Sequence, residues 1–142
     1  MKKQRIWTGI FSCYLMIHAT VAQAELVVVA NPHVSFNHLK QAELRRIFLG
    51  QTSKFPNGEI AVPLDVSGDY RNTFYQSILD KTPEQVETYW AKMIFTGKAE
   101  PARQVRPQEV KQAVAGSSKV ISYMDRSQTD ASVKIINIIR EE

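Results

Sequence analysis

One short segment of the 142-residue chain has residue types that bind anions through the backbone. Ser67-Gly68-Asp69 precedes a stretch with helical periodicity, so its hydroxyl and its glycine lie at the start of a predicted helix. The first N–H groups of a helix are unpaired and carry partial positive charge, and a glycine lets an oxyanion approach them closely. Arg71, one turn into the helix, adds a side chain that forms charge-assisted hydrogen bonds with anions.

The same segment has a second interpretation, without a ligand. The carboxylate of Asp69 at the helix start competes for the N–H groups that an anion would need. A helix capped by its own side chain is therefore also consistent with the sequence. Asp65 lies on the other side of the turn, and we interpret the two carboxylates as a helix cap and a loop contact rather than as an acid–base dyad.

Other patterns of catalytic or metal-binding residues do not assemble in the sequence. His33 and His38 lie five positions apart without a cysteine or an acidic pair to complete a metal site, and we interpret them as solvated loop residues. Serines are frequent, but none lies in a G-x-S-x-G motif. The sequence therefore predicts a protein that is not an enzyme and that needs neither a cofactor nor a metal ion.

Residues 1–24 have the three parts of a secretory signal peptide. A basic start is followed by an apolar run over residues 6–21, and an A-x-A cleavage pattern ends at Ala24. The run is shorter than the roughly 20 residues that span a bilayer, so a membrane anchor is the less favoured interpretation. Lipidation at Cys13 is also less favoured, because the apolar stretch before it is very short. We expect cleavage after Ala24 and a periplasmic protein without stable membrane insertion.

Cleavage changes the charge of the working chain. The leader holds three of the 18 cations and none of the 14 acids, so residues 25–142 keep 15 cations and a formal net charge of +1 instead of +4. Nucleic-acid binding depends on neutralising many phosphates, and this balance argues against it. The only cysteine leaves with the leader, so we expect a single domain that is stabilised by its core alone, without a disulfide.

Apolar patterning predicts four strands. A continuous β-branched run at 26–30 is typical of a strand that is buried on both faces. The second strand is expected at 60–64, where Pro63 indicates an edge position or an irregular end. The last two strands are expected at 120–124 and 133–139.

Segments with helical periodicity lie between these strands. Helices are expected at 41–49, 70–79, 82–96 and 107–115. The clearest helix start is Thr82, which can form a capping box with Gln85. The following apolar stripe consists of Val86, Trp90, Met93 and Ile94. Helices that alternate with strands predict the α/β class.

Several stretches of the chain resemble a known family. Residues 42–50 and the turn at 55–58 resemble the ELxxIFLGK…WxNG signature of phosphate-binding periplasmic proteins. Residues 89–98 and 120–123 are similar to the short, single-domain members of this type II periplasmic binding protein-like family. The resemblance covers nearly all of the mature chain, and it implies one α/β lobe with a mixed sheet flanked by helices.

The resemblance also implies a function. It implies an exported, non-catalytic solute-binding-type protein that is related to the substrate-binding component of phosphate ABC transporters. The ligand would be phosphate or another oxyanion, and the partner a membrane transporter. The family's phosphate contacts correspond to Ser35 and to Ser67-Gly68-Asp69, and Arg71 joins them from the analysis of the helix start.

Departures from the family pattern favour an alternative function. Phosphate binders usually carry an arginine shortly before the turn, where this chain has Asp65. Transport receptors close two lobes around the anion, whereas about 118 mature residues resemble little more than one lobe. The alternative is a periplasmic accessory module that uses the lobe to bind a protein partner. Pairing of two copies through the open face is a further expectation.

Overall fold

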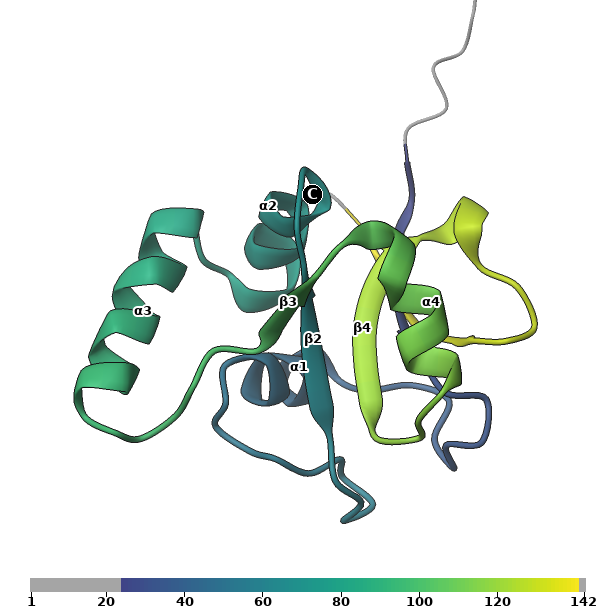
Figure 1. The fold of residues 1–142 in the computed structure, drawn as a ribbon, viewed down its shortest axis with the longest axis horizontal. Helices are drawn as coiled ribbons and strands as arrows, with labels where there is room; N and C mark the ends of the chain where they lie inside the picture. The colour runs from purple at the N-terminus through teal and green to yellow at the C-terminus, as the bar shows by residue number, and fades with distance from the viewer. Residues whose placement is uncertain (1–23, 141–142) are drawn as a thin grey trace, which may run out of the picture.

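A five-stranded mixed sheet is the framework of the structure (Figure 1). The computed structural model describes residues 24–140, and the predicted leader lies outside the described residues except for Ala24. In chain order the elements are β1 Leu26–Ala30, α1 Gln41–Phe48, β2 Val62–Val66, α2 Tyr70–Phe74, the π-helical turn η1 Tyr75–Leu79, α3 Pro83–Phe95, β3 Arg103–Val105, α4 Pro107–Ala115, β4 Val120–Asp125, the 3₁₀ turn η2 Arg126–Gln128 and β5 Lys134–Ile139.

The sheet has the strand order β3-β2-β4-β1-β5. β2 is parallel to both β3 and β4, whereas β1 is antiparallel to both β4 and β5. All five residues of β1 are buried, as the continuous β-branched run predicts for a strand inside a sheet. The predicted α/β class and the mixed sheet flanked by helices are confirmed.

The second strand begins two residues later than predicted. Ile60 does not join the sheet but forms an isolated bridge with Lys54. Pro63 lies near the start of β2, where only β4 pairs with the strand, because β3 pairs with residues 64–66. The irregular strand end expected from Pro63 is therefore confirmed, and β2 is not an edge strand. β3 was not predicted, because only one of its three residues, Val105, is buried and apolar.

The helices cover both faces of the sheet. α4 packs on β4, β1 and β2, whereas α1 and α2 pack on β2 from behind in the view of Figure 1. The predicted helix at 70–79 consists of α2 followed by η1, and it ends at Asp80 with a left-handed backbone. The capping box at the start of α3 is confirmed: the Gln85 N–H donates to the Thr82 hydroxyl, and the Thr82 N–H donates to the Gln85 side chain.

The predicted apolar stripe of α3 is only partly buried. Val86 is buried and Trp90 is half-buried, but Ile94 is 56% exposed and Phe95 is 92% exposed. The stripe is exposed at Ile94 because α3 lies at the β3 side of the molecule and its last turn projects away from the sheet (Figure 1). The Tyr89 hydroxyl ties the helix to the end of α1 by donating to the Leu49 carbonyl at 2.6 Å. Among the described residues, no helix combines the length and apolar character needed to cross a bilayer.

The end of α1 gives a test of how α3 is attached. Gly50 and Gly58 both have left-handed backbones, which cost an L-residue about 1–2 kcal/mol. A Cβ at Gly50 would lie 3.1 Å from Ala99 and 3.2 Å from the Trp90 ring, whereas a Cβ at Gly58 would meet open space. We predict that G50A lowers the free energy of unfolding in urea more than the control G58A does. Equal losses would contradict a packed contact between α1 and α3.

Candidate functional site

The carboxyl ends of β2 and β4 lie at a switch in the sheet topology. The chain leaves β2 through α2, η1 and α3 to reach β3 on one side, and it leaves β3 through α4 to reach β4 on the other. In open α/β sheets ligands bind outside the carboxyl ends of the strands at such a point. A crevice of about 280 Å³ opens here, and its lining includes Tyr70, Tyr123, Asp125 and Lys111.

The predicted anion-binding turn lies beside this crevice, directly after β2. The Ser67 N–H donates to the Val105 carbonyl at 2.9 Å and fixes the turn on β3. Gly68 is exposed and has a φ of +97°, with nothing within 4 Å of the position of a Cβ. Asp69 occupies the N-cap position of α2, but its side chain makes no capping hydrogen bond. The interpretation of Asp69 as a cap is therefore wrong, and its carboxylate does not occupy the N–H groups at the start of α2.

Asp65 is not a loop contact but a buried residue of β2. Its Oδ1 accepts hydrogen bonds from the Tyr123 hydroxyl at 2.5 Å and from the Val66 N–H at 3.0 Å. Its Oδ2 accepts from the Tyr75 hydroxyl at 2.7 Å and from Arg71 Nε at 3.0 Å. These four donors compensate the cost of burying a carboxylate, so Asp65 joins β2, β4 and the helix after the turn.

The two tyrosine hydroxyls remain donors over the whole working range of pH. Burial, followed by the hydrogen bond to Asp65, raises the pKa of Tyr75 above its ordinary value. Burial, followed by the charge of the Asp65 carboxylate, raises the pKa of Tyr123 in the same direction. Ionisation of either phenol would place a second negative charge beside Asp65 in a buried position, which is unfavourable.

Arg71 points toward Asp65 and away from the turn. Its Nε donates to Asp65 and also to the Tyr75 hydroxyl at 2.6 Å, and its guanidinium lies 5.0 Å from the centre of the Tyr75 ring. The side chain is 40% exposed, and its Nη groups make no hydrogen bond within the described residues. It lines a second pocket, of about 230 Å³, on the α2 side of β2.

Ser35 lies at the other end of the sheet. It follows β1, whose last residue Ala30 pairs with Ile121 at the start of β4, whereas Ser67 follows the carboxyl end of the parallel strand β2. The Ser35 hydroxyl accepts a hydrogen bond from the Asn57 side chain at 3.0 Å. The structure thus brings Ser67, Gly68 and Asp69 together, turns the Arg71 side chain aside and keeps Ser35 apart.

The crevice contains both signs of charge. The Ser127 N–H, which donates to Asp125, lowers the pKa of that carboxyl. Lys111 forms an ion pair with Asp130 at 3.0 Å at the crevice. An anion at the turn therefore has the Asp125 carboxylate nearby in addition to that of Asp69, and the lysine of the crevice, Lys111, is already paired with Asp130.

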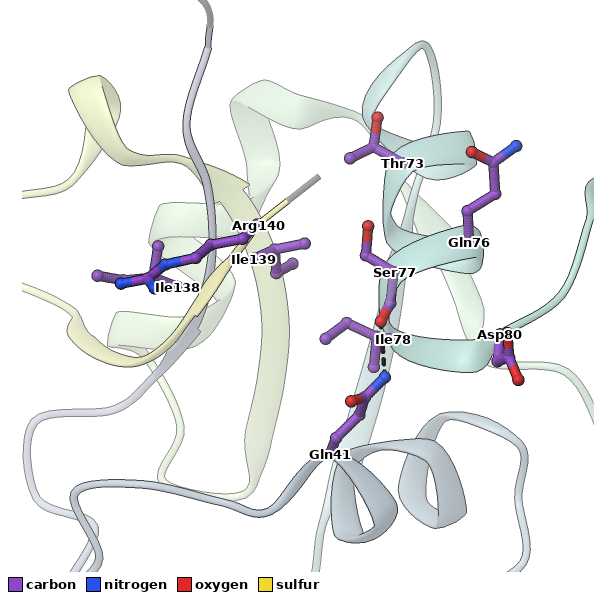
Figure 2. A pocket seen from close by; sticks show the side chains of 9 residues that line it. All are labelled: Gln41, Thr73, Gln76, Ser77, Ile78, Asp80, Ile138, Ile139 and Arg140. Carbon is purple, nitrogen blue, oxygen red and sulfur yellow. Dashed lines mark hydrogen bonds between the residues drawn. The ribbon is translucent and has the colours of Figure 1, made fainter. Parts of the chain in front are cut away.

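Neither a metal site nor the hollow beside η1 adds to this site. The described residues contain no group of three potential metal ligands, and His33 and His38 are exposed, as the loop interpretation predicts. A hollow of about 720 Å³ lies between η1 and β5. Figure 2 shows that Gln41 donates to the Ser77 carbonyl there, while Arg140 extends away from the helix. None of the predicted site residues lines this hollow.

Sequence reasoning missed Tyr75, Tyr123 and Trp90 as parts of the site. One signal was available: Asp65 interrupts an apolar strand, and a carboxylate in such a strand requires buried donors. The identity of those donors could not be read from the sequence, because Tyr123 lies 58 positions away.

Comparisons with known proteins show the fold. No known protein family matches the chain, and neither does any curated protein. Solved structures do match. A phosphate ABC transporter substrate-binding protein from Clostridium perfringens has a TM-score of 0.64 and 15% identity, over 80% of this chain and 44% of that one. An ABC-type phosphate transport receptor from Vibrio cholerae has a TM-score of 0.63 and 19% identity, over 80% of this chain and 46% of that one. PstS from Borrelia burgdorferi is also similar, with a TM-score of 0.59 and 12% identity over 84% of this chain and 49% of that one.

These similarities confirm the predicted resemblance at the level of the fold. The chain has the α/β fold of part of a phosphate-binding receptor, and it spans less than half the length of each of these proteins.

The Asp65 cluster gives a prediction about stability. Y123F keeps the ring, which stacks on Phe74 at 4.0 Å, but it removes a hydroxyl that donates to the buried carboxylate. We expect a loss of about 1–3 kcal/mol in the free energy of unfolding, measured in urea. The control is Y70F, because the hydroxyl of this half-buried tyrosine donates to Asp125 and its loss costs less. Equal losses would contradict the central position of Asp65.

Two carboxylates near the crevice predict an acid-dependent loss of stability. The Ser132 hydroxyl and N–H, followed by Lys111, lower the pKa of Asp130 to about 2, and the pKa of Asp125 is also lowered. Because the pKa of an unfolded aspartate is about 3.9, these groups stabilise the fold above that pH and lose this effect as the pH falls toward about 2. We expect the thermal midpoint of D130N to fall less than that of the parent chain between pH 5 and pH 2.5. An identical fall in both proteins would contradict the prediction.

Proposed function

We propose that this chain is an exported, non-catalytic solute-binding-type protein of the periplasm that binds phosphate or another oxyanion. The observation that carries the proposal is the turn Ser67-Gly68-Asp69, in which Gly68 and Asp69 are exposed and Ser67 is half-buried. The turn lies at the carboxyl end of β2, and the following helix has no side-chain cap. The fold shared with phosphate receptors supports the same function, with a membrane transporter as the partner.

The turn offers an oxyanion two kinds of donor. The N–H groups at the start of α2 carry partial positive charge, and the Ser67 hydroxyl adds a rotatable donor. Gly68 leaves space for the anion to approach, because it has no side chain and no neighbour there. Arg71 adds no donor at the turn, because its side chain is directed toward Asp65.

A calorimetric titration of residues 25–142 with phosphate at low salt tests this proposal. We expect binding with a dissociation constant on the order of millimolar, because the turn faces water. S67A is expected to weaken binding by about two- to tenfold through the loss of one hydrogen bond. D69N is expected to strengthen binding, because it removes a negative charge next to the anion.

The control for this titration is S35A. Ser35 lies at the opposite end of the sheet, so its removal is expected to leave phosphate binding unchanged. No heat with phosphate or with other oxyanions at millimolar concentration would overturn the proposal, and an S35A effect as large as that of S67A would place the anion elsewhere.

The last turn of α3 favours a second candidate, an accessory module that binds a protein partner or a second copy of itself. Phe95 and Ile94 are exposed there, and such a surface is typical of interaction sites. We expect sedimentation or copurification from a periplasmic extract to show an assembly that the double variant I94S/F95S loses. Identical behaviour of the parent chain and the variant would exclude this surface.

A further inference from the structure

The last turn of α3 presents the two most exposed large apolar side chains of the described residues. Phe95 is 92% exposed and Ile94 is 56% exposed. The helix has 13 residues, of which only Val86 is buried, and it stands apart from the sheet (Figure 1). Adjacent exposed apolar residues are typical of a surface that packs against another molecule.

A groove of about 690 Å³ lies on the same flank, over the amino end of β2. One wall is formed by residues 98–103, which follow directly from the last turn of α3, and the other by the end of α4. The groove is open because β3 pairs only with residues 64–66, so the amino end of β2 is not covered on that side. We call this hollow the β2 groove.

The accessible lining of the β2 groove is mostly apolar. Val62 is 40% exposed on its floor, and Pro63, Trp90 and Val120 are half-buried around it. Aromatic side chains that enter pockets of this kind are the usual anchors of protein interfaces. The β2 groove is therefore suited to an exposed apolar side chain such as Phe95.

The backbone beside the β2 groove excludes a different occupant, an added strand. The Ala61 N–H already donates to the Ser53 carbonyl. The Val62 N–H donates to the Lys119 carbonyl, on the side of β4. Pro63 follows and has no N–H. A further strand would find no donor at this edge, so the groove recognises side chains.

The charges around the two surfaces are complementary. The groove wall carries Lys98, Glu100 and Arg103, and the exposed side of α3 carries Glu87 and Lys92. None of these five side chains takes part in the ion pairs of the described residues. Each surface thus has unpaired charges of both signs next to its apolar centre, which is the arrangement that a partner with the same surface would satisfy.

We propose that two copies of this chain pair around a two-fold axis, with Phe95 of each copy in the β2 groove of the other. The inference rests on the second candidate function, whose partner it identifies as a second copy. Because the apolar turn and the groove lie on one flank, a single axis covers both surfaces on each copy. Lys92 then lies against the partner's Glu100. The net charge of +1 for residues 25–142 adds little repulsion.

The size of the contact predicts a weak dimer. A buried aromatic side chain covers about 150–250 Å², so two such contacts form an interface at the lower end of the specific range. We expect a dimer that dissociates on dilution. Sedimentation equilibrium of residues 25–142, which contain every described element, is expected to show an average mass that rises with concentration toward twice that of one chain.

A matched pair of variants tests the β2 groove. V62E places a charge on the groove floor, and we expect it to weaken the dimer about tenfold or more, because the charge would be buried beside Phe95. The control is I138E. Ile138 is also a strand residue and is 41% exposed, but it lines the hollow beside η1, so I138E is expected to pair like the parent chain. Circular dichroism establishes that both variants are folded.

A charge exchange tests the two-fold geometry. K92E and E100K each place like charges opposite one another at both contacts, and each is expected to weaken the dimer about tenfold. The double variant K92E/E100K restores opposite charges in reversed order and is expected to pair like the parent chain. A double variant as weak as the single ones would overturn the proposed contact.

The remaining outcomes separate the inference from the functions proposed above. A monomer at every concentration overturns the inference, as does a dimer that V62E and I138E weaken equally. A monomer that captures a different protein, in a manner that I94S/F95S abolishes, overturns the inference and leaves the second candidate function standing. The phosphate titration of V62E is expected to match that of the parent chain, because the groove and the turn Ser67-Gly68-Asp69 lie at opposite ends of β2.

Discussion

The buried carboxylate of Asp65 is the contact on which the geometry of the site depends. A carboxylate inside an apolar sheet is unfavourable unless donors surround it, and here they come from β2 itself, from β4 and from the helix that follows the turn. The same four hydrogen bonds therefore join the two parallel strands to that helix. The turn Ser67-Gly68-Asp69 is held between these anchored elements, so its exposed position follows from the burial of Asp65.

Asp65 also separates two surfaces with different chemistry. On one side the crevice at the carboxyl ends of β2 and β4 is lined by residues of both charges, including Lys111 and Asp125, and on the other side the pocket near Trp90 is lined by Arg71 and Asp65 above a buried aromatic layer. Tyr123 reaches between them, because it lines the crevice while its hydroxyl donates to Asp65. The Arg71 side chain lies on the side of the Trp90 pocket, where it contacts Asp65. The predicted anion site therefore does not assemble as one site, because its backbone turn faces the crevice and its cation faces the pocket.

The sequence predicted elements better than contacts. β1, α1, α4 and the capping box of α3 follow from local patterns, because their signals lie within a few residues of one another. β3 could not be predicted, since three mostly polar residues become a strand only by pairing with β2. The cap interpretation of Asp69 is wrong, and the exposure of Ile94 within an apolar stripe could not be predicted, because tertiary packing and not the local pattern decides both. The turn after β2 was predicted as the candidate site, but the buried cluster around Asp65 that supports it was not foreseen.

The position of β1 in the sheet affects the order of folding. This strand pairs with β4 and β5, which are about 100 residues further along the chain, so the centre of the sheet cannot close until both are available. Such nonlocal pairing slows folding, because a long loop must be ordered before any strand contact compensates for it. Until that closure the apolar run 26–30 has no partner strand, and an unpaired apolar strand is prone to aggregation.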